Sequence, residues 1–143
     1  MGWGFLYFMT KIFSYGKKEK LKSRKLIQEL FSKGKMFTVY PVKVFYMQPA
    51  VLMDNQVKTG VGTSTRHFKK AVDRNRVKRL LREIYRIEKL PLHEYLKSSG
   101  KQVVIFFLYV DKSMPEYPEL KTKMHLALHK LMKQLNEASV ENT

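Results

Sequence analysis

Eight consecutive apolar residues, Val103 to Val110, constrain the fold of this chain more than any other segment. A run of this length is typical of a β-strand, and its lack of polar positions indicates that both faces of the strand are covered. The run is also too short to cross a membrane. We therefore expect a central strand in a sheet with helices packed on it, as in a small α/β sandwich.

Two segments have the apolar spacing of amphipathic helices that could cover such a sheet. The first extends from Leu21 to Lys33, with Ser23 as its N-cap and Gly34 placed to end it in the left-handed conformation. The second begins after Pro115 and Pro118, because proline is favoured in the first turn of a helix. The buried stripe predicted for this last helix is Leu120, Met124, Leu128, Leu131 and Leu135.

Strands are expected earlier in the chain. Phe37 to Met47 is rich in branched and aromatic residues and is predicted as a strand with an irregular entry at Pro41. Val57 to Thr63 is predicted as a second strand, whose two glycines permit close approach by another backbone. A short third strand is expected near Thr63 to Thr65, and Pro91 to Lys101 is predicted to form a loop.

A strongly cationic helix is predicted between these strands. Residues 66–86 contain nine lysines and arginines, yet from Val77 onward apolar residues recur at helical spacing. Four of the cations follow one another at every fourth position, where like charges repel and weaken an isolated helix. They are Arg74, Lys78, Arg82 and Arg86. Helix stability therefore does not explain this row of cations. Binding to a partner rich in phosphate would explain it.

Composition also favours an anionic partner. The chain has 28 lysines and arginines against 12 acidic residues, which gives a formal net charge of +16. The alternative, a solvated basic face, normally mixes both signs of charge, and only Asp73, Glu83 and Glu88 dilute this one. Nucleic acid is the leading candidate and an anionic membrane surface the second, because both attract cations through their summed charge.

The chain has the composition of one domain. Hydrophobic residues make up 44% of it, which is too many for a disordered tail. We expect a disordered extension over residues 1–16, or a true start at Met9, followed by one domain over residues 17–137 and a frayed tail over residues 138–143. The lack of cysteine excludes disulfides and thiolate metal sites and favours a cytoplasmic location.

Signatures of enzyme chemistry are mostly missing. Gly60 and Gly62 are not followed by the Lys-Ser/Thr pair of a phosphate-binding loop. His125 and His129 have the spacing of a zinc pair, but neither a third histidine nor a cysteine lies near them in the sequence, so two surface histidines are the simpler interpretation. We predict no catalytic residue and no metal ligand in the chain, and we expect any reactive centre to belong to a partner.

The basic segment resembles a known family. Lys70 to Glu83 is similar to the Arg-Asn-Arg signature of the bacterial ribonuclease P protein family. Leu21 to Gly34 is similar to the opening helix of that family and Val42 to Met47 to its first long strand, so the resemblance covers roughly residues 17–135. It implies an α+β fold of the order α-β-β-β-α-β-α, built as a two-layer sandwich like domain 2 of ribosomal protein S5, with a left-handed βαβ crossover.

The resemblance also implies a function, as a subunit of the ribonucleoprotein that removes the 5′ leader from precursor tRNA. Its partners would be ribonuclease P RNA, which carries out the hydrolysis with Mg²⁺ ions, and precursor tRNA, with no small-molecule substrate. The residues implied to contact RNA are Arg66, Lys69, Lys70, Arg74, Asn75, Arg76, Lys78, Arg79 and Arg82. Asn75 could equally form a local bond at the start of the helix.

The substrate leader would lie in a cleft between the first helix and the sheet, where aromatic rings can stack on unpaired bases. Phe31, Phe45 and Tyr46 are the candidates by position, and each could equally be packed in the core. The chain departs from the family pattern at Ile27, where an aromatic residue is usual, and at Thr65, where a lysine is usual.

Two other classes of protein fit the same basic helix. One class binds structured RNA without any role in its processing. The other lies on a membrane surface and would use the cationic helix together with residues 1–8 as an anchor. A resemblance that extends over most of the chain favours the ribonuclease P assignment over both.

Overall fold

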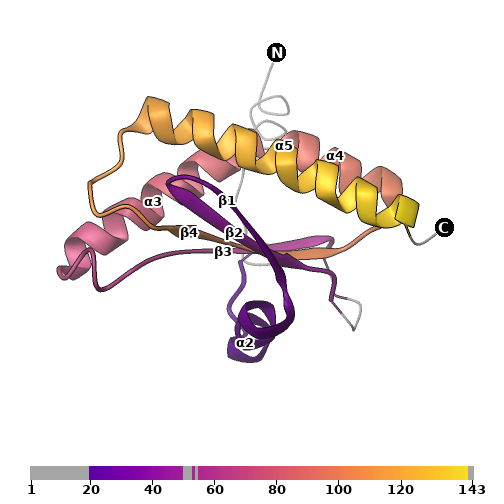
Figure 1. Ribbon diagram of the computed structural model, residues 1–143, viewed down its shortest axis with the longest axis horizontal. Helices are drawn as coiled ribbons and strands as arrows, with labels where there is room; N and C mark the ends of the chain where they lie inside the picture. Colours follow the sequence, from indigo (N-terminus) through magenta and orange to yellow (C-terminus); the bar gives the residue numbers. More distant parts are fainter. Residues whose placement is uncertain (1–19, 50–52, 54, 142–143) are drawn as a thin grey trace, which may run out of the picture.

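A four-stranded sheet carries helices on both of its faces (Figure 1). The computed structural model describes residues 20–49, 53 and 55–141, so the predictions for residues 1–16 lie outside the described residues. The elements in chain order are α2 (Arg24–Lys33), β1 (Lys35–Val39), β2 (Val42–Met47), β3 (Val57–Thr63), α3 (Ala71–Glu88), α4 (Leu90–Ser99), β4 (Val103–Tyr109) and α5 (Tyr117–Glu141). The predicted order of elements is confirmed, with α4 as an addition.

β4 lies inside the sheet, as its continuous apolar sequence predicts. The strand order is β1-β2-β4-β3. β4 is antiparallel to β2 on one side and parallel to β3 on the other. Parallel neighbours need a long crossover connection, and α3 and α4 supply it between β3 and β4.

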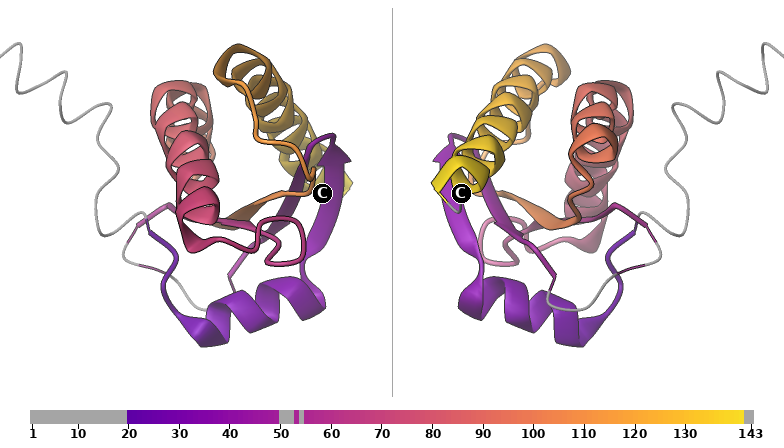
Figure 2. Two further views of the ribbon diagram at one scale, coloured as in Figure 1. Left: turned by 90° about the vertical axis from the view of Figure 1, so that its left-hand side faces the viewer. Right: turned by 90° about the vertical axis from the view of Figure 1, so that its right-hand side faces the viewer.

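Each face of the sheet builds its own hydrophobic core. Ile105 and Phe107 of β4 belong to the larger core, which the sheet forms with α3, α4 and α5. Val104 belongs to a smaller core with Leu21 and Leu30, on the side of α2. Figure 2 shows α2 alone on one side of the sheet and the longer helices on the other. The predicted sandwich of a sheet and a helical layer is therefore confirmed, and α2 adds a partial cover to the second face.

The segment predicted as one strand forms a hairpin. β1 and β2 pair antiparallel with Val39 opposite Val42, and the turn between them consists of Tyr40 and Pro41. Pro41 has no amide hydrogen to donate to a neighbouring strand, so a single strand does not continue through it. β1 and β2 therefore supply two of the three strands that precede the basic helix. No strand forms at the position predicted for the third, because residues 64–70 adopt turns and irregular structure.

α4 occupies the segment that was predicted to be a loop. Pro91 lies in its first turn, where the lack of an amide hydrogen has no cost. Leu92 and Leu96 lie one turn apart and are fully buried, so burial of this face stabilises the helix. The helix ends at Gly100, which has the left-handed φ of 70°. The loop prediction was wrong because proline, which breaks the interior of a helix, also favours its start.

α2 begins at Arg24, later than the predicted Leu21, and ends at Lys33 as predicted, but its C-cap has a different conformation. The amide of Leu26 donates a hydrogen bond to Ser23 Oγ (3.3 Å), which confirms Ser23 as the N-cap. Gly34 is extended, with a φ of −73° and a ψ of 162°, and is not left-handed as predicted. A glycine is required there for space, because a Cβ atom would clash with the carbonyl oxygen of Leu30.

The two glycines of β3 make room for an aromatic ring, and not for another backbone as predicted. Gly60 pairs with Phe106 of β4, and Gly62 lies two residues further along the same face. A Cβ at Gly62 would lie 2.7 Å from Phe106 Cζ, and a Cβ at Gly60 would lie 2.9 Å from Phe106 Cδ2. The Phe106 ring therefore occupies the space that two side chains of β3 would otherwise fill.

α5 packs on the sheet and on α3 with the predicted stripe inward. All five residues of that stripe are buried: Leu120, Met124, Leu128, Leu131 and Leu135. On another face of α5, His125 Nδ1 lies 3.0 Å from Glu88 Oε2 at the end of α3. The helix continues to Glu141, past the predicted start of the tail. Within the described ranges, no helix has the length and apolar character needed to cross a membrane.

Gly62→Ala is expected to lower the free energy of unfolding by about 1–3 kcal/mol, because the added methyl group overpacks the space held by Phe106. Urea unfolding followed by circular dichroism measures the loss. In a Phe106→Leu background, which removes the ring, the same substitution should cost less. An equal cost in both backgrounds would show that the ring is not the reason for glycine at this position.

Candidate nucleic-acid interface

The apolar side of α3 anchors the helix to the protein core. Val77, Leu81, Ile84 and Tyr85 are buried, and Leu80 is partly buried against the same cluster. Because this stripe is fixed in the core, the other faces of α3 are available to solvent. The cations of α3 therefore project from a helix that is held in place by the core.

Most of the predicted RNA-binding side chains lie on exposed faces of α3 or in the turn before it. Arg74 and Lys78 are the half-buried members of the set. The exposed members are Arg66, Lys69, Lys70, Asn75, Arg76, Arg79 and Arg82. Asn75 lies in the second turn of α3, beyond the first amides of the helix. The fold thus brings the predicted residues together along one element, with most of their charge in contact with water.

Arg74 has a structural role in addition to its charge. Its Nη1 donates hydrogen bonds to the carbonyl oxygens of Phe68 (2.9 Å) and Lys69 (2.7 Å). These bonds connect the turn before α3 to the helix. The Phe68 ring in this turn is also buried in the larger core. Arg74 therefore positions the cations that precede α3, and it offers fewer free donors to a partner than the exposed Arg76 does.

A groove of about 560 Å³ lies beside α3. Its lining consists of Lys20, Asn75, Arg79, Arg82, Glu83 and Arg86. Lys20 reaches α3 because its backbone pairs with Thr59 of β3. Lys20, Glu83 and Arg86 were not predicted as site residues. Helical spacing from Asn75 and Arg79 could have indicated the last two, whereas the position of Lys20 depends on the fold.

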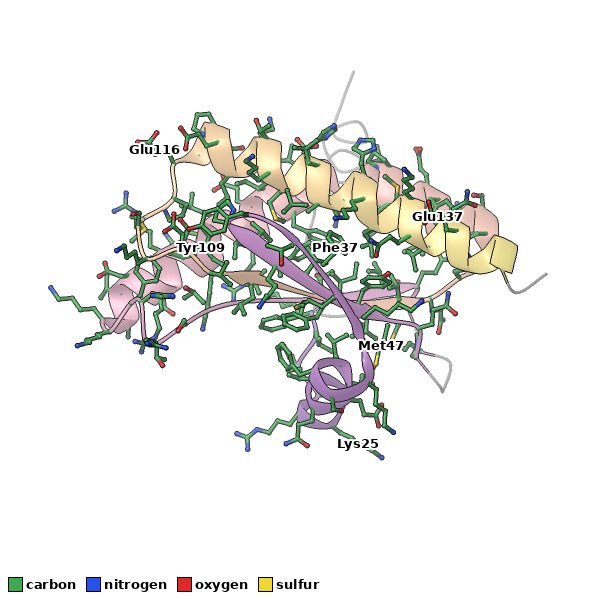
Figure 3. The ribbon with its side chains drawn as sticks, viewed as in Figure 1. Lys25, Phe37, Met47, Tyr109, Glu116 and Glu137 are labelled. Atoms are coloured by element: carbon green, nitrogen blue, oxygen red, sulfur yellow. The ribbon has the colours of Figure 1, made fainter. Side chains whose placement is uncertain are left out.

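Three phenylalanines meet between α2 and the sheet. The ring of Phe31 lies edge-on to Phe45 of β2, with centroids 4.7 Å apart, and to Phe106 of β4, with centroids 5.1 Å apart. Phe31 is 44% exposed, and the other two residues are half-buried. We call these three residues the α2 aromatic cluster. Figure 3 shows this side of the sheet, where Met47 of β2 is labelled.

Phe106 is a member of the cluster that was not predicted from the sequence. A continuous apolar run does not indicate which of its two faces is directed toward α2, but the two glycines of β3 could have indicated room for a large ring. Lys43 lies on the same face of β2 as Phe45, because alternate residues of a strand point the same way. Ile27, where the family usually has an aromatic residue, packs against the smaller core.

Tyr46 lies on the opposite face of the sheet from the α2 aromatic cluster. Its side chain is buried in the larger core, and its hydroxyl donates a hydrogen bond to Gln134 Oε1 of α5 (2.5 Å). Burial raises the pKa of the Tyr46 phenol, and the nearby Glu137 adds to the rise. The fold therefore brings Phe31 and Phe45 together without Tyr46, which has the core-packing role that the sequence left open.

Arg74→Ala is expected to lower the free energy of unfolding by about 1–2 kcal/mol, because two hydrogen bonds from a charged donor are lost. Arg76→Ala removes an exposed arginine from the same helix and should change that free energy by less than about 0.5 kcal/mol. Urea and thermal unfolding of the two variants measure the difference. Equal stabilities would contradict the structural role of Arg74.

Known proteins share both the sequence pattern and the fold. The pattern of the Ribonuclease P family matches residues 15–133. The ribonuclease P protein component of Porphyromonas gingivalis is 31% identical over 130 residues, which cover 91% of this chain and 95% of that protein. The ribonuclease P protein component of Borrelia duttonii is 36% identical over 104 residues, which cover 71% of this chain and 82% of that protein.

A solved structure of a Staphylococcus aureus RNase P protein, a mutant with defective mRNA degradation activity, matches this chain with a TM-score of 0.60. The match covers 93% of this chain and 98% of that one at 17% sequence identity, so it supports the fold alone. The family assignment comes from the sequence matches, which include the basic helix and extend over most of the chain. The chain belongs to the family of ribonuclease P protein components, subunits of the ribonuclease P endoribonuclease.

Proposed function

We propose that this chain binds ribonuclease P RNA and the 5′ leader of precursor tRNA, and so assists removal of the leader. The observation that carries the proposal is the set of exposed arginines on α3, Arg76, Arg79 and Arg82, on a helix whose other side is fixed in the core. Family membership supports ribonuclease P RNA as the partner. The lack of cysteine favours a cytoplasmic location for the complex.

The RNA carries out the hydrolysis in the proposed complex. Metal-assisted cleavage of a phosphodiester uses cations that stabilise the attacking and leaving oxygens, and we assign these Mg²⁺ ions to the RNA subunit. The protein contributes binding energy and charge neutralisation. A chain with a net charge of +16 lowers the repulsion between RNA segments, so the complex should need less Mg²⁺ to reach its active form.

α3 is proposed to contact phosphates of the catalytic RNA. Each exposed arginine offers a planar fork of donors that matches two phosphate oxygens at once. Because Val77, Leu81 and Ile84 fix the helix in the core, the backbone of α3 needs no ordering when RNA binds, and this reduces the entropic cost of association. Lys69 and Lys70 extend the same surface into the turn before the helix.

The α2 aromatic cluster is proposed to bind unpaired nucleotides of the leader. Phe31 has 44% of its surface exposed, and its edge-on contacts with Phe45 and Phe106 hold the ring in position. A ring held in this way is a stacking platform for any base, and Lys43 can contact the nucleotide backbone beside it. α2 and α3 lie on opposite sides of the sheet, so the two RNAs would contact different surfaces (Figure 2).

Addition of the chain to ribonuclease P RNA and precursor tRNA at low Mg²⁺ should raise the rate of leader removal, because protein cations neutralise phosphates in place of Mg²⁺. Arg76→Ala should weaken binding to the RNA by about 1–3 kcal/mol and raise the protein concentration needed for half-maximal cleavage. Lys97→Ala, which removes an exposed cation from α4, is the matched control. It should leave the RNA affinity and the protein concentration for half-maximal cleavage unchanged.

Three results would contradict parts of the proposal, one of them from a separate vesicle-flotation assay of the full chain. Tight RNA binding without any gain in cleavage would favour a structured-RNA-binding protein that has no role in processing. Binding to anionic vesicles without binding to RNA would favour a membrane-surface protein. Equal losses of affinity in Arg76→Ala and Lys97→Ala would show that α3 is not the RNA-binding face.

Phe31→Ala should weaken the binding of precursor tRNA to the complex by about 1–3 kcal/mol, because one stacking platform is lost. Mature tRNA, which has no leader, should bind the wild-type and variant complexes equally. Phe31→Trp keeps an exposed ring and should retain the affinity for precursor tRNA. Filter binding of both tRNAs at one salt concentration measures these differences. Equal weakening of precursor and mature tRNA by Phe31→Ala would show that the leader does not contact the cluster.

A further inference from the structure

Glu83 is an acidic side chain within the cationic surface of α3. It follows Asn75 and Arg79 at every fourth position, so the three side chains lie in one row along the helix. All three are exposed, and all three line the groove of about 560 Å³ beside α3. The groove therefore offers an amide, a guanidinium and a carboxylate in succession.

A carboxylate at this position opposes phosphate binding. Each negative charge on the surface reduces the summed attraction between the cations and the RNA backbone. Glu83 therefore cannot make a favourable contact with a phosphate group. An ionised carboxylate only accepts hydrogen bonds, so its counterpart in RNA must be a donor, such as an amino or imino group of a base.

Guanine is the base whose edge best matches a carboxylate. Its Watson–Crick edge has two donors side by side, the N1–H and the N2 amino group, whereas the same edges of adenine and cytosine have one amino donor each. The two carboxylate oxygens can accept from both guanine donors at once. Such edges are free in unpaired RNA, and the groove volume lies in the range of about 300–1,000 Å³ that is common for ligand sites.

We propose that this groove binds an unpaired guanine of the RNA partner, with the oxygens of Glu83 accepting hydrogen bonds from N1–H and from the N2 amino group. Arg79 and Arg82, which line the same groove, hold the adjacent phosphates. This assignment rests on the proposed function, because it requires RNA to bind at α3. It adds base specificity to a surface that otherwise recognises only charge.

The test measures binding of the full chain to four uridine octamers that carry one central guanosine, inosine, adenosine or cytidine. Inosine keeps N1–H and lacks the N2 amino group. The wild-type chain should bind the guanosine octamer about tenfold more tightly than the adenosine and cytidine octamers, with inosine between them, and Glu83→Gln should remove the preference. Glu94→Gln makes the same charge change at an exposed position of α4 outside the groove and should keep the preference.

The two explanations of Glu83 predict different results. If Glu83 only dilutes charge, the wild type shows no preference and Glu83→Gln tightens binding to all four octamers, as Glu94→Gln does. That result would overturn the guanine site and leave the proposed function intact. A guanosine preference that survives in Glu83→Gln would also overturn the site. A chain that binds neither the octamers nor ribonuclease P RNA would overturn both proposals.

Discussion

Burial of β4 on both faces is the constraint on which both candidate RNA surfaces depend. On one face, Ile105 and Phe107 build the core that holds α3 and so fixes the direction of its arginines. On the other face, Phe106 supports the exposed ring of Phe31. A shift of β4 by one residue would exchange these two sets of side chains and disrupt both surfaces together. The positions of the cations and of the aromatic rings are thus set by one strand.

The charge pattern of α3 is tolerated because the helix does not depend on it for stability. Like charges one turn apart cost about 0.2–0.5 kcal/mol per pair, whereas burial of one large apolar side chain contributes about 1.5–3 kcal/mol. Val77, Leu81 and Ile84 are fully buried, so their contribution exceeds the repulsion along the cationic row. Tertiary packing therefore lets this surface carry far more positive charge than an isolated helix would.

Features that depend on burial alone could be predicted from the sequence. The continuous apolar run predicted the central position of β4 in the sheet. The buried stripes of α3 and α5 could also be predicted, because each stripe lies on one helix and recurs at helical spacing. α4 was missed because the segment begins with Pro91 and contains Ser98-Ser-Gly100, residues that are common in loops. The grouping of the candidate cations was predictable where they share one helix, as Arg76 and Arg79 do. Lys20 and Phe106 were missed because their contacts join segments far apart in the chain.

The central claim is that the exposed arginines of α3 bind the RNA that carries out cleavage. Ultraviolet crosslinking of the full chain to ribonuclease P RNA, with the crosslinked peptides identified by mass spectrometry, tests this claim most directly. We expect the crosslinked peptides to lie within residues 66–86. Crosslinks confined to α4 and α5, with none within residues 66–86, would contradict the claim.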